Sequence, residues 1–292
     1  MTNRRKPNKA RIILLPRMKN DSNPDSSNPR LRVVEGRHNA LVKELRQAFG
    51  RGELTPGGFC AIEGARIIEE AIRSGLRFHA VFFSHSAKAK AERLLPQLGA
   101  RVETVLLPDK LFASAIPSDS PQGVAALVML KETAVEQILG RTQAGPLLVL
   151  AGIQDPGNLG AILRSAEAFG TAGVLLTEGT VSPFNPKVVR SSAGSLFRIP
   201  FARVKLAELM PKLREKGIRL AATSSHKGVS LPQAKLSSPL AIFIGNEGAG
   251  VAKDLIAQMD ETFVVPHAPQ VESLNAAVAT SIVLYEAARQ RK

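Results

Sequence analysis

Three short segments of the sequence bring polar side chains and glycines together in ways that could support chemistry. The first, residues 154–165, contains Asn158 and Arg164 and follows an apolar run. We expect Asn158 to be the N-cap of a helix, because an asparagine side chain accepts hydrogen bonds from the free N–H groups at a helix start. On a helical wheel, Arg164 lies nearly opposite the apolar stripe through Leu159 and Ile162. Arg164 is therefore predicted to be exposed, either as a solvated residue or as a group that contacts a substrate.

The second segment is the apolar run of residues 240–244, which ends in Gly245-Asn246-Glu247-Gly248. Glycines at a strand end let main-chain groups approach a ligand closely. The spacing is neither that of a dinucleotide fingerprint nor that of a Walker phosphate loop. The segment favours a main-chain ligand site of another kind, with a plain turn as the alternative.

The third segment, residues 264–275, ends in Ser273-Leu274-Asn275 and leads into a long helix predicted from about Leu274 to Arg291. Ser273 and Asn275 stand at the expected helix start, where they could act as caps. They could equally bring polar groups to a site formed with the two preceding segments.

The sequence predicts no metal site and no disulfide. Cys60 is the single cysteine and lies in an apolar run, which favours a buried thiol in a protein of a reducing compartment. The five histidines show no spacing typical of metal ligands.

The elements that must position the three segments alternate along the chain. Continuous apolar runs predict strands that are buried on both faces, as in a parallel α/β sheet. In the second half of the chain these strands are expected at residues 147–151, 173–177, 198–201, 219–223, 241–245 and 262–265. A similar alternation in the first half predicts a smaller α/β domain.

Composition divides the chain into four regions. Residues 1–30 contain eight Lys or Arg and two Asp, a net charge of +6, and too few apolar residues for a core. We interpret them as a disordered basic extension, either a solvated tail or an arm that becomes ordered on RNA. The remaining regions are a first domain at 31–130, a linker at 131–145 and a second domain at 146–292.

The whole chain is strongly basic. Its 292 residues include 39 Lys and Arg against 25 Asp and Glu, a formal net charge of +14, which favours a polyanionic partner such as nucleic acid. No apolar run reaches the roughly 20 residues that span a bilayer, so we expect no membrane contact and predict a cytoplasmic protein. The basic start of the chain leaves an organelle transit peptide as the alternative.

In this order and spacing, the three segments resemble the signature motifs of the SpoU (TrmH-like) family of SPOUT methyltransferases. The similarity covers roughly residues 145–290. The matching residues are Asn158-Leu159-Gly160 with Arg164 in the first motif, Ile244 to Gly248 in the second, and Ser273-Leu274-Asn275 with Ala279 and Thr280 in the third. Residues 187–194, between the first and second motifs, also resemble the family. The first domain resembles the family's substrate-binding domain, a ribosomal-protein-like α/β fold, through residues 37–39, 62–64 and 121–124.

The resemblance implies an α/β fold whose second domain is a SPOUT-type domain with a deep trefoil knot. S-adenosyl-L-methionine would bind in the knot and be held mostly by main-chain groups. The residues implied at this cofactor are Thr223, Gly245, Val265 and Leu274. Members of the family are homodimers, so a homodimer is implied, with the last helix as a candidate contributor.

The resemblance also implies methylation of a ribose 2′-hydroxyl in RNA, with Arg164 as the key catalytic residue. Because the pKa of an arginine exceeds about 12, positioning of the ribose is favoured over proton abstraction, and both stay open. The other residues implied in catalysis are Asn158, Glu247, Ser273 and Asn275. Ribosomal RNA of the 23S type is favoured over transfer RNA. The alternatives are a non-catalytic RNA-binding or ribosome-assembly factor and a base methyltransferase.

Overall fold

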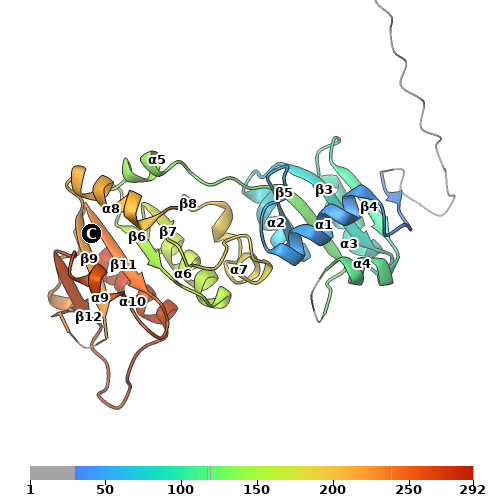
Figure 1. Cartoon of the computed structure of the whole chain (residues 1–292). Helices are drawn as coiled ribbons and strands as arrows, with labels where there is room; N and C mark the ends of the chain where they lie inside the picture. Colours follow the sequence, from blue (N-terminus) through green and yellow to red (C-terminus); the bar gives the residue numbers. More distant parts are fainter. Residues whose placement is uncertain (1–29, 117, 119, 226, 238, 292) are drawn as a thin grey trace, which may run out of the picture.

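The computed structural model describes residues 30–291 except 117, 119, 226 and 238, and consists of two α/β units joined by an extended linker (Figure 1). Each unit is built around its own sheet, five-stranded in the first and seven-stranded in the second. Residues 1–29 of the basic extension lie outside the described residues, so its interpretation as a tail or an RNA-binding arm stays a prediction.

The first sheet is mixed, with strand order β1-β4-β3-β5-β2. Its strands are β1 (Arg32–Val33), β2 (Phe59–Glu63), β3 (Phe78–Ser84), β4 (Glu103–Leu107) and β5 (Val124–Met129), and β5 runs antiparallel to both of its neighbours. The helices are α1 (Ala40–Arg51), α2 (Ala65–Arg73), α3 (Lys88–Leu94) and α4 (Asp109–Ala115), with short 3-10 turns at His85–Ala87 and Leu95–Gln97.

Helices cover both faces of this first sheet, because successive side chains of a strand point to opposite sides. Phe82 of β3 lies in the same apolar cluster as Phe112 of α4, whereas Phe83 lies in the cluster that includes Ile68 of α2. Cys60 of β2 is fully buried, and this burial, with a smaller effect of the Glu53 charge, raises the pKa of its thiol to about 12. The prediction of a buried thiol is confirmed.

The second sheet has strand order β10-β12-β9-β11-β6-β7-β8, and every neighbouring pair is parallel. Its strands are β6 (Leu147–Ala151), β7 (Gly173–Leu176), β8 (Phe201–Arg203), β9 (Arg219–Ser224), β10 (Val229–Ser230), β11 (Leu240–Gly245) and β12 (Glu261–Val264). The helices from the linker onward are α5 (Val135–Leu139), α6 (Pro156–Ala168), α7 (Pro186–Ser191), α8 (Leu206–Glu215), α9 (Lys253–Ile256) and α10 (Ala276–Arg289), with 3-10 turns at Ser195–Phe197 and Leu231–Gln233.

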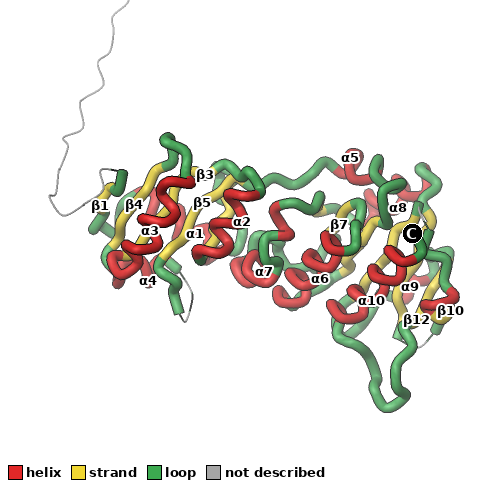
Figure 2. Tube along the Cα trace, turned by 180° about the vertical axis from the view of Figure 1, so that it is seen from behind, coloured by secondary structure: helices red, strands yellow, loops and turns green. Residues whose placement is uncertain are grey.

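Helices pack on both faces of the second sheet, as the continuous apolar runs predicted. Leu148 and Leu150 of β6 belong to the apolar cluster that contains residues of α6, α7 and α10, which lie together in the view from behind (Figure 2). Leu147 and Val149 belong to the cluster on the opposite face, with residues of α5, α8 and α9. The α/β fold with a preceding smaller α/β domain is confirmed, while the trefoil knot stays a prediction.

The strand expected at residues 198–201 is misplaced. The chain makes a 3-10 turn at Ser195–Phe197, and β8 begins only at Phe201. Pro200 explains the difference, because proline has no N–H to donate and so cannot take a full place in a ladder. The last helix likewise begins at Ala276 rather than Leu274, because Asn275 is its N-cap.

Among the described residues, no helix is long and apolar enough to cross a membrane. The same part of the chain contains no group of three or more His, Cys, Asp or Glu side chains arranged to hold a metal ion.

Candidate active site

The first motif lies at the start of α6, which begins three residues earlier than expected. Asp155, not Asn158, is the N-cap, and its carboxylate accepts a hydrogen bond from the main-chain N–H of Asn158 at 2.8 Å. The prediction of Asn158 as N-cap is therefore wrong. The pair Asp155-Pro156 is the signal for the true start, since proline is favoured at the first position of a helix. The side chain of Asn158 is consequently available to other partners.

Glu247, in the loop after β11, joins the second motif to the first. Its carboxylate accepts hydrogen bonds from the main-chain N–H groups of Gln154 at 3.1 Å and Asp155 at 3.0 Å, and from Nδ2 of Asn158 at 3.1 Å. Partial burial acts to raise the pKa of Glu247, but these hydrogen bonds outweigh burial and lower the pKa below its usual value. The residue is therefore a charged acceptor that fixes the loop before α6.

Asn275 joins the third motif to the first. As the N-cap of α10, its Oδ1 accepts from the main-chain N–H groups of Ala277 at 2.9 Å and Val278 at 3.2 Å. Its Nδ2 donates to Oδ1 of Asn158 at 2.9 Å. The caps and the site contacts that the sequence left as alternatives thus coexist in one residue, and Asn158 lies between Asn275 and Glu247.

Asn246 shapes the glycine-rich loop and was missed by sequence reasoning. Its main chain exchanges two hydrogen bonds with Gly250, at 3.0 and 2.9 Å, and its Oδ1 accepts from the N–H of Gly248 at 3.0 Å. Its Nδ2 donates to the carbonyl of Gly152 at 2.9 Å, in the loop that follows β6. An asparagine between glycines at a strand end is the signal that could have found it, because asparagine side chains commonly close turns.

Gly245 allows this loop to fold back tightly on β11. A Cβ atom at this position would lie 2.0 to 2.2 Å from main-chain atoms of Gly250 and Val251. Parallel pairing also sets Gly245 beside Ala151 of β6, so the second motif lies next to the loop that leads into the first.

A hollow at the carboxyl ends of β9, β11 and β12 collects most of the predicted site residues. All four residues implied at the cofactor line it, and so do two of those implied in catalysis: Thr223, Gly245, Val265, Leu274, Glu247 and Ser273. The lining combines apolar walls such as Ile244 with the main chain of residues 245–251, a combination suited to a small ligand with a flat apolar part and polar edges. His267, which the sequence did not single out, also lines the hollow.

Asn158, Asn275 and Arg164 are not among the residues that line the hollow. Hydrogen bonds connect Asn275 to Asn158 and Asn158 to the lining residue Glu247, whereas Arg164 has no such connection among the described residues. It is exposed on α6, as predicted, about 9 Å along the helix from Asn158. In the described part of the chain, no hydrogen-bond or ion-pair partner faces its guanidinium. The side chain is therefore free to meet an external group.

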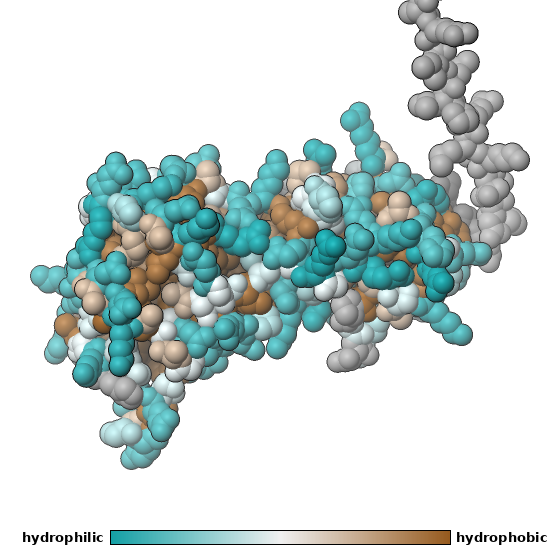
Figure 3. All heavy atoms as spheres, in the orientation of Figure 1, coloured by the Kyte–Doolittle hydropathy of each residue, from teal (hydrophilic) through white to brown (hydrophobic). Residues whose placement is uncertain are grey.

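A second hollow, of about 510 Å³, lies between α5, β7 and α8. Figure 3 shows apolar side chains gathered on this face of the second unit. Its basic residues are already paired, Lys212 with Glu136 at 2.6 Å and Arg203 with Glu132 at 2.7 Å. Because it contains none of the predicted site residues, we assign no chemistry to it.

Known proteins resemble this chain over most of its length. It is 30% identical over 255 residues to the 23S rRNA (guanosine(2553)-2′-O)-methyltransferase RlmP of Bacillus subtilis, covering 87% of this chain and 98% of that protein. It is 39% identical over 175 residues to the 23S rRNA (guanosine-2′-O-)-methyltransferase RlmB of Vibrio parahaemolyticus, covering 58% and 71%. The SpoU methyltransferase AviRb of Streptomyces viridochromogenes, solved with the cofactor AdoMet, has a TM-score of 0.77 at 30% identity, covering 87% and 98%.

The fold and the hollow define a class of two-domain α/β proteins in which a parallel-sheet domain holds a small-ligand site and a separate domain precedes it. Residues 145–285 match the model of the SpoU rRNA Methylase family, and residues 39–126 match that of the MRM3-like substrate binding domain. The chain belongs to the SpoU rRNA methylase family of the SPOUT superfamily, as its motifs predicted.

Proposed function

We propose that this chain is an S-adenosylmethionine-dependent methyltransferase that methylates a ribose 2′-hydroxyl of ribosomal RNA. The observation that carries the proposal is the series of hydrogen bonds from Asn275 through Asn158 to Glu247, which joins all three family motifs beside one hollow. The 2′-O-methyltransferases and the AdoMet-bound structures that resemble the chain support this substrate and donor. They give no support to a non-catalytic role.

The donor would occupy the hollow lined by Thr223, Gly245, Val265 and Leu274. Its sulfonium group supplies a methyl group that is open to nucleophilic attack. The main chain of residues 245–251 offers hydrogen-bonding groups without long side chains, and the apolar walls suit an adenine ring. Glu247 acts through the loop, because its carboxylate is occupied by Asn158 and by main-chain N–H groups.

Methyl transfer to a ribose hydroxyl requires alignment of a poor nucleophile and control of its proton. We assign to Arg164 the role of holding the ribose and an adjacent phosphate, since its planar guanidinium suits bidentate contacts with oxygen. Ser273 lines the hollow without a hydrogen bond among the described residues, which leaves its hydroxyl available to the ribose. Asn158 and Asn275 position α6 and α10 around this point.

Donor binding tests this proposal directly. Calorimetric titration with S-adenosylhomocysteine, the demethylated product, is expected to give about one site per chain, because the residues of all three motifs lie together at the hollow. Mass-spectrometric mapping of ribose methylation in total RNA, with and without the gene, would then identify the target nucleotide. A folded protein that binds neither the donor nor its product would contradict the proposal.

We also propose that the chain forms a homodimer through α10. This helix is apolar on both sides: Val283 and Leu284 are buried in the core, whereas Val278, Ile282 and Tyr285 repeat at helical spacing and are 50%, 38% and 57% exposed. A helix that is apolar all round is normally buried all round. A second copy of the chain would cover the exposed side.

The dimer proposal predicts that Ile282→Glu produces monomers at micromolar concentration, because it places an unpaired carboxylate in the interface at a cost of several kcal/mol. Light scattering on the wild type should give twice the mass of one chain. Val229→Glu is the matched control: Val229 is 37% exposed and belongs to the edge strand β10 rather than to α10, so this variant should remain dimeric. A monomeric wild type would overturn the proposal.

The proposed methyltransferase activity assigns a role to each region of the chain. Residues 31–130 would bind the RNA, residues 131–145 would link the domains and residues 146–292 would carry out methyl transfer. We place this activity in the cytoplasm, because a single cysteine, Cys60, suits a reducing compartment.

A further inference from the structure

The two domains meet around a shared apolar core that is bordered by ion pairs. One buried cluster contains residues of α2 in the first domain and of α6 and α7 in the second. Three arginines of the second domain pair with glutamates of the first: Arg190 with Glu63 at 3.6 Å, Arg198 with Glu70 at 3.1 Å and Arg203 with Glu53 at 3.0 Å. In each pair the second domain supplies the positive side chain and the first domain supplies the negative one.

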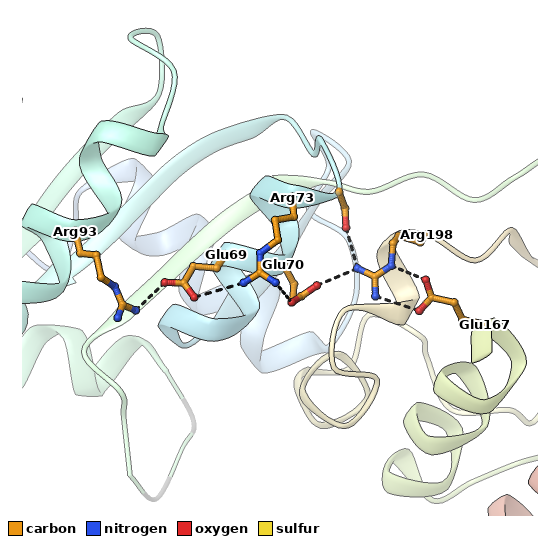
Figure 4. Close-up of polar contacts among 7 residues, drawn as sticks. Glu69, Glu70, Arg73, Arg93, Glu167 and Arg198 are labelled. Atoms are coloured by element: carbon orange, nitrogen blue, oxygen red, sulfur yellow. Dashed lines mark hydrogen bonds and ion pairs between the residues drawn. The ribbon is translucent and has the colours of Figure 1, made fainter.

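Arg198 differs from the other two arginines because it holds α6 and α2 together (Figure 4). Its Nε and Nη2 donate to the two carboxylate oxygens of Glu167 on α6, at 2.5 and 3.0 Å. Its Nη1 donates to Glu70 and to the hydroxyl of Ser74, both at 3.1 Å. Because all three nitrogens of this planar guanidinium donate hydrogen bonds, both the distance and the relative orientation of α6 and α2 are constrained.

The partner of Arg198 on α2 belongs to a wider set of ion pairs. Arg73 contacts Glu70 at 2.8 Å and Glu69 at 3.8 Å, and Arg93 of α3 contacts Glu69 at 2.7 Å. The network shown in Figure 4 therefore runs from α3 through α2 to α6 and alternates arginine with glutamate throughout. Arg198 is the member that crosses from one domain to the other.

Glu167 is close to the proposed catalytic arginine. Arg164 precedes it by three residues on α6, and side chains at this spacing are neighbours on a helix surface. The hydrogen bond from Arg198 is the main cause that lowers the pKa of Glu167, so the pair stays ionised at neutral pH. Bracing Glu167 thus braces the turn of α6 that carries Arg164.

We infer that Arg198 is a positioning residue, which fixes the first domain against the turn of α6 that bears Arg164. RNA held by the first domain would thereby meet the active site at a fixed distance and angle. The RNA part of this inference rests on the proposed function, whereas the tie between the domains does not. Partly exposed ion pairs contribute little to folding stability, so we expect the effect of Arg198 on geometry to exceed its effect on melting temperature.

The tie can be tested without activity by measuring distances between paired spin labels. Ser114→Cys in the first domain and Lys253→Cys in the second supply exposed labelling sites, while the native Cys60 is fully buried. Labelled chains are diluted with unlabelled ones, so that each assembly carries one labelled chain. Arg198→Ala should broaden the distance distribution. Arg73→Ala is the matched control, because it breaks ion pairs of the same network that stay within α2, and its distribution should match the wild type.

Methylation of a 23S rRNA transcript tests the consequence for catalysis. Arg198→Ala should lower kcat/KM about tenfold or more, since small misplacements of reacting groups are costly, with unchanged affinity for S-adenosylhomocysteine. Arg198→Lys should restore little of the lost kcat/KM. A lysine keeps the positive charge but lacks the planar guanidinium that contacts Glu167 and Glu70 at the same time. Arg73→Ala should behave as the wild type.

Two outcomes would contradict the inference. A distance distribution of Arg198→Ala as narrow as that of the wild type would show that Arg198 does not fix the two domains together. A broadened distribution with normal kcat/KM would show that Arg198 has no positioning role in catalysis. If the wild type methylates no RNA, the proposed function fails while the distance measurement still decides the tie.

Discussion

Arg164→Ala is expected to lower the single-turnover rate of RNA methylation by about 10² to 10⁴, the range typical of a positioned catalytic group. Folding should be nearly unaffected, because Arg164 is exposed while Leu159 and Ile162, on the other side of α6, are fully buried. Affinity for S-adenosylhomocysteine should also change little, since the hollow is lined by other residues. Rapid-quench kinetics, calorimetry and thermal melting measure these three quantities separately. Near-normal turnover would remove Arg164 from the mechanism.

Arg164→Lys distinguishes the two ways in which the arginine could act. A lysine keeps the positive charge but presents a single ammonium group instead of a planar fork. If the arginine works by holding the ribose and phosphate together, the lysine variant should remain close to the alanine variant. Recovery of most of the rate would show that charge alone is sufficient.

Gly245→Ala is expected to abolish measurable binding of S-adenosylhomocysteine. The added methyl group would lie 2.0 to 2.2 Å from main-chain atoms of Gly250 and Val251, so the loop that lines the hollow must move away from β11. Forcing atoms into a packed site typically costs about 1–3 kcal/mol of folding stability. Calorimetry measures the loss of affinity, and denaturant unfolding measures the loss of stability.

Gly248→Ala is the matched control for this loop. Its added methyl group would meet only Oδ1 of Asn246, at 3.7 Å, which is an ordinary contact. The stability of this variant should therefore equal that of the wild type. Equal behaviour of Gly245→Ala and Gly248→Ala would show that close packing of the loop is not what builds the hollow.

Much of the fold could be predicted from the sequence because the strands of a buried parallel sheet appear as continuous apolar runs. Runs such as Leu147–Ala151 and Leu240–Gly245 are apolar throughout, since helices cover both faces of the sheet. The edge strand β8 leaves a weaker trace, because it has three residues and begins directly after Pro200. The order of the strands in the sheet depends on contacts across the whole chain, which no local pattern records.

Most residues of the candidate site could be predicted, but the hydrogen bonds between them could not. The residues around Gly245 and Leu274 could be placed at one cofactor site because their segments resemble the motifs of the family. The acceptor role of Glu247 towards the loop before α6 could not be read from the sequence, because its main-chain partners lie 92 and 93 residues away. The distance of Arg164 from the hollow within one chain was equally hidden, since a helical wheel gives the side of a helix and not what faces it.

The hydrogen bond between Asn158 and Asn275 joins residues 117 positions apart, which has a consequence for how the protein is made. Closing a long stretch of chain carries an entropic cost and slows folding, so contacts of this kind form late. A nascent chain can complete the first sheet and α6 before Asn275 has been synthesised. The methyl donor, which binds only the completed hollow, would then stabilise the last step of folding by mass action. Binding of the donor would thus favour the fully folded second domain once the chain has left the ribosome that made it.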